Sequence, residues 1–126
     1  MSTHIIRSAD APRFNLPGVE FTGLASPSRG TSEVCTWTIA VQAGHDSPEP
    51  HTIDRDEVFL VTAGALRLHP DTNVLQLGDA AVVPAGTPIQ VSNPGTDTAR
   101  AVVSIAAAFS AHAADGSAIG TPPWAQ

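Results

Sequence analysis

The chain has 126 residues, which is the usual size of one domain and leaves no room for two substantial ones. Apolar residues make up 42% and charged residues only 14%, so a hydrophobic core is expected and general disorder is excluded. All six basic residues are arginines, and twelve acidic residues give a net charge of −6, which argues against nucleic acids and anionic membrane surfaces as partners.

Cysteine content and the N-terminus bear on the cellular compartment. Cys35 is the only cysteine, so no internal disulfide forms, and the first residues lack the charged and apolar regions of a secretory leader. The longest mostly apolar run, residues 99–109, is interrupted by Arg100 and Ser104 and is too short to span a bilayer. We therefore expect a cytoplasmic protein without a membrane segment.

Residues 1–33 are divided by prolines and glycines into short apolar pieces. We expect one or two short strands there, around Ile5 and over residues 19–24. In residues 35–41 large apolar side chains alternate with smaller ones at a period of two, which predicts a strand with two unlike faces. Residues 44–50 are rich in turn-forming residues and predict a loop.

Short apolar segments separated by turn residues continue toward the C-terminus. No segment has a sustained helical period, and strands of this length and spacing indicate an all-β sandwich or barrel. In the tail, Trp124 is expected to dock on the barrel or on a partner subunit. The further predicted strands are residues 58–63, 65–69, 74–77, 80–83, 89–92 and 99–106.

The segment GDAAVVPAGTPIQVSN carries a regular spacing of turn residues. Gly78 is followed after five residues by Pro84 and then by Gly86, and Asn93 ends the segment. Glycine permits the positive φ of a tight turn, and proline suits a strand end that needs no donor. This spacing resembles the second signature motif of the cupin superfamily, in which the position of Ile89 usually holds a histidine.

A second segment, GHDSPEPHTIDRDEVFLVTAG, ends at Gly64 and resembles the first cupin motif. Counting back from this glycine places Glu57 on the motif glutamate, His51 on its first histidine and Ile53 on its second. The two motifs span residues 44–93, about half of the chain. The resemblance implies a small single-domain cupin, a jelly-roll β-barrel over residues 34–109 with N-terminal strands or an arm at 1–33 and a tail at 110–126.

In this superfamily, function usually depends on a divalent iron, manganese, nickel, copper or zinc ion held in the barrel by three histidines and one glutamate. The resemblance carries two of these four positions, His51 and Glu57, whereas Ile53 and Ile89 place aliphatic side chains at the other two. Two protein ligands are too few for a tight transition-metal site. We therefore expect a degenerate metal site and no bound metal or other cofactor.

The motifs leave a histidine and a carboxylate in an otherwise apolar cavity. Burial raises the pKa of a carboxyl group and lowers that of an imidazole, so His51 and Glu57 are candidates for an acid–base pair. The alternative interpretation is that the two side chains satisfy each other as a relic of a metal site. The side chains expected to line the cavity and contact a small organic ligand are Trp37, Ile39, Ile53, Phe59, Ile89 and Val91.

Three functions are compatible with these residues. The leading one is a cupin-like protein that binds a small, largely apolar molecule without a tightly held metal, either as a binding protein or as an isomerase, cyclase or lyase using His51 and Glu57. The second is a metal-dependent enzyme, such as a dioxygenase, in which His45 or His69 restores a third ligand beside His51 and Glu57. The third is a structural or accessory subunit whose barrel is filled by its own side chains.

Association with a second copy is also expected. Barrels of this family commonly dimerise by packing sheets together or by exchanging N-terminal strands, which protects exposed strand edges. We therefore expect a homodimer that involves residues before Gly30.

Overall fold

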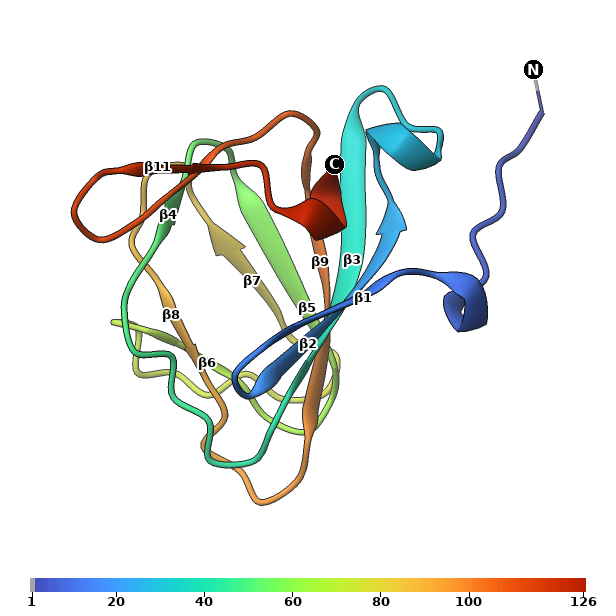
Figure 1. Cartoon of the computed structure of the whole chain (residues 1–126). Helices are drawn as coiled ribbons and strands as arrows, with labels where there is room; N and C mark the ends of the chain where they lie inside the picture. Colours follow the sequence, from blue (N-terminus) through green and yellow to red (C-terminus); the bar gives the residue numbers. More distant parts are fainter. Residues whose placement is uncertain (1) are drawn as a thin grey trace.

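The computed structural model describes residues 2–126, which form short β-strands joined by turns (Figure 1). The only helical segments in this described part are three-residue 3₁₀ turns at Ser8–Asp10, Pro27–Arg29 and Pro123–Ala125. The strands are β1 (Arg13–Leu16), β2 (Val19–Ala25), β3 (Val34–Val41), β4 (Thr52–Ile53), β5 (Glu57–Ala63), β6 (Arg67–His69), β7 (Ala80–Val83), β8 (Gln90–Ser92), β9 (Ala99–Ala106), β10 (Ala111–His112) and β11 (Ala118–Gly120).

Six strands form the larger sheet, in the order β1-β2-β3-β9-β5-β7, with antiparallel neighbours throughout. The alternation predicted for residues 35–41 is present in β3, where Cys35, Trp37, Ile39 and Val41 are buried. Their burial on one face of the sheet supplies the core, because successive side chains of a strand point to opposite faces. The all-β prediction is confirmed.

The smaller sheets form the opposite wall of the molecule (Figure 1). One has the order β11-β10-β4, and the other pairs β6 with β8. A bridge joins them: the backbone N–H of His51 donates to the carbonyl of Ile89 at 3.0 Å, and the N–H of Ile89 donates to the carbonyl of His51 at 3.0 Å. Two walls of antiparallel strands thus face each other across the core, as in a jelly-roll barrel.

Most predicted strands are present, but two are wrong. Ile5 lies in an irregular segment with 68% of its surface exposed, so it has no sheet to join. Residues 74–77 make only an isolated bridge between Leu75 and Leu66, and the chain then turns so that the N–H of Asp79 donates to the carbonyl of Gln76. The strands not predicted are β1, β4, β10 and β11.

Two motif residues act on the backbone. Gly64 has a φ of +70°, and a Cβ there would lie 2.9 Å from both the Cα of Ala99 and the carbonyl oxygen of Thr98, so no other residue fits. Asn93 is buried and donates its side-chain amide to the carbonyls of Val41 and Asp97, at 3.0 and 2.9 Å. The contact with Val41 joins the end of β8 to the end of β3.

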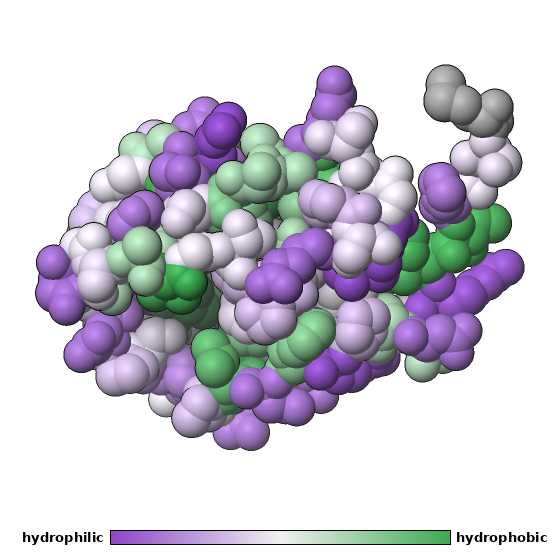
Figure 2. Space-filling model, turned by 45° about the horizontal axis from the view of Figure 1, so that its top comes forward, coloured by the Kyte–Doolittle hydropathy of each residue, from purple (hydrophilic) through white to green (hydrophobic). Residues whose placement is uncertain are grey.

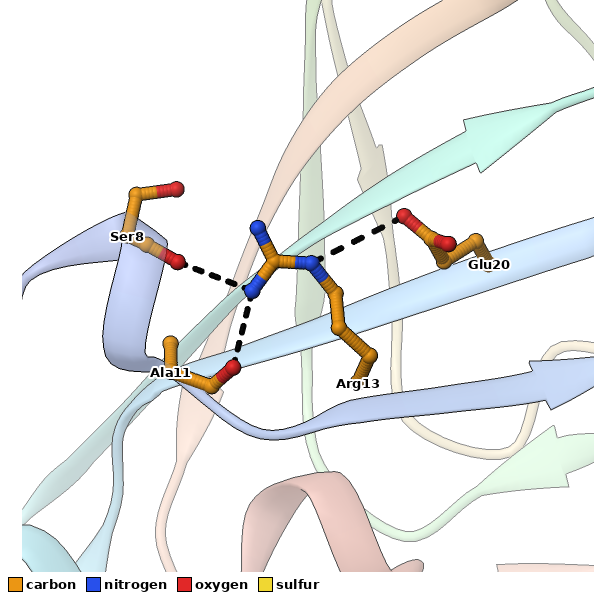
Figure 3. Close-up of polar contacts among 4 residues, drawn as sticks. All are labelled: Ser8, Ala11, Arg13 and Glu20. Atoms are coloured by element: carbon orange, nitrogen blue, oxygen red, sulfur yellow. Dashed lines mark hydrogen bonds and ion pairs between the residues drawn. The ribbon is translucent and has the colours of Figure 1, made fainter.

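The segment before β1 is held by Arg13 (Figure 3). Its Nη1 donates to the carbonyl oxygens of Ser8 and Ala11, both at 2.8 Å, and its Nε lies 3.8 Å from a carboxylate oxygen of Glu20. The exposed ion pair adds little stability, whereas the two hydrogen bonds fix the path of the chain into the edge strand.

The C-terminal segment crosses one end of the barrel (Figure 1). The ring of Trp124 stacks on Phe21 of β2, with centroids 3.7 Å apart and planes 7° from parallel. Arg29 donates to the carbonyl oxygen of Trp124 at 3.0 Å, and the fully buried Ser26 donates to the backbone oxygen of Gln126 at 2.8 Å. Trp124 therefore docks on the barrel, one of the two predicted outcomes.

A search of the described residues for helices long and apolar enough to cross a membrane finds none.

The contacts of Trp124 lead to a stability prediction. Replacing this residue in Trp124→Ala removes a stacked, half-buried ring, so the free energy of unfolding should fall by about 1–3 kcal/mol in denaturant titrations. Leu77→Ala is the matched control, because Leu77 is 72% exposed and its loss should change the value by less than about 0.5 kcal/mol. Equal unfolding midpoints for Trp124→Ala and the unmodified protein would contradict the assigned docking.

Candidate functional site

A cavity of about 1220 Å³ lies between the two walls and opens at the surface. Figure 2 shows a recess with apolar surface among largely polar lobes. Aromatic rings form much of the interior: Trp37 on β3 and Phe59 on β5 both line it, and Phe109 stacks against Trp37 with centroids 5.7 Å apart. Strand pairing sets the positions of two of these rings. Trp37 on β3 and Phe59 on β5 both pair with Val103 of the strand between them, β9.

Glu57 is the first residue of β5 and faces the interior. Its parity matches that of Phe59 and Val61, so the alternation of the strand buries all three side chains. Only 3% of Glu57 is exposed, and its Oε1 has no hydrogen-bond partner among residues 2–126. Burial raises the pKa of Glu57 to about 7, because a charged carboxylate is poorly solvated there.

His51 reaches the same cavity from the opposite wall. Its backbone is fixed by the bridge to Ile89, and its partly buried side chain lines the cavity. Burial lowers the pKa of His51, so the imidazole is neutral at pH 7. No hydrogen bond or ion pair joins His51 to Glu57 in the described chain, so the two groups share a cavity without satisfying each other.

Five of the six predicted ligand-contacting residues line this cavity, namely Trp37, Ile39, Ile53, Phe59 and Val91. Ile89 does not line it. This buried residue borders a separate hollow of about 610 Å³ beside β7, together with Leu68 and Val83. The deepest lining residues, Phe109 and Val103, are fully buried by their neighbours, so the cavity is widest toward its exposed rim.

The residues present do not fit the four-ligand metal centre typical of cupins. Ile53 is one of the cavity's apolar residues, and His69 lies on β6 outside the lining. His45 lines the mouth, where its Nε2 is 3.2 Å from the Oγ of Ser47. Within residues 2–126, no three His, Cys, Asp or Glu side chains gather as a metal site, so the rebuilt set of His45 or His69 with His51 and Glu57 is not assembled.

Sequence reasoning missed the part of the site built by residues outside the motifs. Phe21, Phe109, Thr121 and Trp124 all line the cavity, although they come from β2 and from the chain after β9. The only sequence signal was the large ring at Trp124 in an otherwise small and polar tail. The contribution of these segments follows from long-range packing, which local patterns do not encode.

The buried carboxyl of Glu57 makes stability depend on pH. Its pKa is 4.5 in an exposed reference state and about 7 in the fold, so between these values the folded chain binds more protons than the unfolded chain. The free energy of unfolding therefore falls as the pH rises from about 4.5 to about 7, and this group accounts for about 3 kcal/mol of the fall. Glu57→Gln should lose that component in denaturant titrations at pH 4 and pH 8.

Glu33→Gln is the matched control, because Glu33 is exposed and its carboxylate has no hydrogen bond or ion pair within residues 2–126. It should keep the pH dependence of the unmodified protein. The assignment would be overturned if Glu57→Gln kept it as well.

The chain is similar to known proteins in sequence and in fold. The family model described as a cupin domain matches residues 37–105, more than half of the chain. No curated protein matches. The polyketide cyclase RemF from Streptomyces resistomycificus is a similar solved structure, with a TM-score of 0.73 and 16% identity over 83% of this chain and 80% of that one.

Two further solved structures have the same fold. A sugar phosphate isomerase of the cupin superfamily from Silicibacter pomeroyi has a TM-score of 0.63 and 26% identity, over 79% of this chain and 67% of that one. KdgF from Halomonas sp. has a TM-score of 0.65 and 20% identity, over 83% of this chain and 94% of that one. These structures share the fold, and the match of the cupin domain model over residues 37–105 shows that the chain belongs to the cupin family.

Proposed function

We propose that this cupin binds a small, largely apolar organic molecule in the cavity between its two walls and acts on it by proton transfer through Glu57 and His51. The observation that carries the proposal is the carboxyl of Glu57, which is buried in the cavity and has one oxygen without a hydrogen-bond partner among residues 2–126. A buried polar atom without a partner costs about 1–3 kcal/mol, so a ligand that hydrogen-bonds to it recovers that energy.

The two groups have complementary protonation states. With a pKa of about 7, Glu57 is present in both the acid and the carboxylate form near neutral pH, while His51 is neutral. Proton transfer is most effective when the pKa of the catalytic group lies near the working pH. Two such groups can remove a proton beside a carbonyl and return one elsewhere, the step that isomerisation, cyclisation and elimination have in common.

The similar solved structures give this reaction class independent support. They include a polyketide cyclase and a sugar phosphate isomerase, both built on the same barrel. We propose that the chemistry does not rely on a tightly bound transition metal, since the donor set retains only His51 and Glu57 of the family's four ligand positions.

Deuterium exchange tests the proposed proton transfer. The unmodified protein should accelerate exchange at the carbon beside the carbonyl of an enolisable aromatic ketone in D₂O, followed by loss of the proton signal in NMR. Glu57→Gln should lower that rate about a hundredfold, because the side-chain amide of glutamine cannot act as a general base. The rate should rise with pH through about 7, as the carboxyl of Glu57 ionises.

The surface variant Glu33→Gln makes the same chemical change outside the cavity and should exchange at the unmodified rate. Equal rates in Glu57→Gln and the unmodified protein would remove Glu57 from the mechanism. Binding of the ketone without any acceleration would reduce the function to ligand binding.

Metal analysis tests the other half of the proposal. Protein purified without a polyhistidine tag and without added metal should contain far less than one transition metal ion per chain, because two protein ligands bind such ions weakly. Elemental mass spectrometry provides the measurement. A near-stoichiometric metal that disappears in His51→Ala would favour the metal-dependent enzyme instead.

A further inference from the structure

The charges around the cavity are all of one sign, apart from two histidines. Asp46, Glu49 and Glu57 line it, and so do His45 and His51. The sequence has no lysine, and none of the six arginines is among the described residues of the lining. The described lining therefore offers a ligand no permanent positive charge.

Two arginines near cavity-lining segments, Arg13 and Arg29, are bound elsewhere, whereas Arg55, between Ile53 and Glu57, is exposed to solvent and is not part of the lining. Arg13 is held by Ser8, Ala11 and Glu20 on the outside of the sheet (Figure 3). Arg29 donates to the carbonyl oxygens of Leu24 and Trp124, behind the ring that lines the cavity. Moving either guanidinium toward a ligand would break these hydrogen bonds.

An anionic group would be poorly received in such a cavity. Phosphate and carboxylate groups are generally held by arginine, lysine or the N-terminus of a helix. The described chain has only three-residue 3₁₀ turns, so it offers no helix of useful length. An anion entering here would lose hydration without gaining a counter-charge, and would approach the carboxylates at the mouth.

The walls favour flat rings instead. Trp37 and Phe109 stack on one side, and the stacked rings of Phe21 and Trp124 contribute another part of the lining. Phe59 and Trp37 lie on either side of Val103 in neighbouring strands of the same sheet. Aromatic side chains in this number give a planar apolar ligand large contact area and stacking partners.

We propose that the ligand of this cavity is a flat aromatic or polycyclic molecule that carries hydroxyl or carbonyl groups but no negative charge, so that phosphorylated and carboxylated compounds are excluded. The inference rests on the proposed function, because it describes the occupant of the same cavity. It separates this chain from its sugar phosphate isomerase neighbour, despite their shared barrel.

A pair of probes with one ring system tests the inference. The affinities of 2-naphthol, which is neutral at pH 7, and 2-naphthoate, which is anionic, are measured by calorimetry at fixed ionic strength. 2-Naphthol should bind about tenfold more tightly than 2-naphthoate. The carboxylate of 2-naphthoate would lose its hydration in the cavity without gaining a positively charged partner. Trp37→Ala should weaken the binding of naphthol, which localises it to the cavity.

An added positive charge supplies the reverse test. Gln42 is exposed and lies at the cavity, so Gln42→Arg should raise the affinity for naphthoate by about tenfold and leave that for naphthol nearly unchanged. Gln76→Arg is the matched control, because Gln76 is exposed outside the cavity and the substitution changes the net charge equally. It should leave both affinities unchanged.

The outcomes separate the inference from the proposed function. Naphthoate binding as tightly as naphthol, with both weakened in Trp37→Ala, would overturn the exclusion of anions and leave a ligand-binding cavity. Failure of both probes to bind, or binding unaffected by Trp37→Ala, would overturn the proposed function and the inference with it. If Gln42→Arg and Gln76→Arg raised the affinity for naphthoate equally, the net charge of the protein and not the cavity lining would control selection. That result would also overturn the inference.

Discussion

The register of β9 between β3 and β5 decides which side chains face the cavity. Val103 lies opposite Trp37 on one side and Phe59 on the other, and Ile105 lies opposite Glu57. A shift of one residue would turn each inward side chain to the outer face, because the side chains of a strand alternate with a period of two. The aromatic walls and the buried carboxyl are therefore products of one strand pairing.

The same apolar surroundings explain both electrostatic properties of the site. They raise the pKa of Glu57 because nothing in the described chain compensates its charge, and they disfavour any anion that enters for the same reason. The proposed proton transfer and the proposed selection for an uncharged ligand thus have the same physical origin. An arginine in the lining would lower the pKa of Glu57 and admit anions at once.

At the two positions where the family usually has histidine ligands, this chain has isoleucines that belong to the hydrophobic core. Ile53 is buried within the second wall, and the backbone of Ile89 still forms its bridge to His51. The turn at Gly64 and the amide contacts of Asn93 define the strand ends through backbone geometry alone. Apolar side chains at these two positions therefore support the barrel through packing, while the turns and the bridge rest on the backbone.

Local patterns in the sequence determined the class of fold and most strand positions, because alternation and turn residues recur within a few positions of each other, and the motif resemblance pointed to His51 and Glu57. They could not place the short strand β4, which exists only through its pairing with β10, or the wall formed by Trp124, whose partner Phe21 is about a hundred residues away. Nor could they show that His51 and Glu57 share a cavity without pairing. Only the tertiary structure decided these features, because they depend on which distant segments pack together and at what separation.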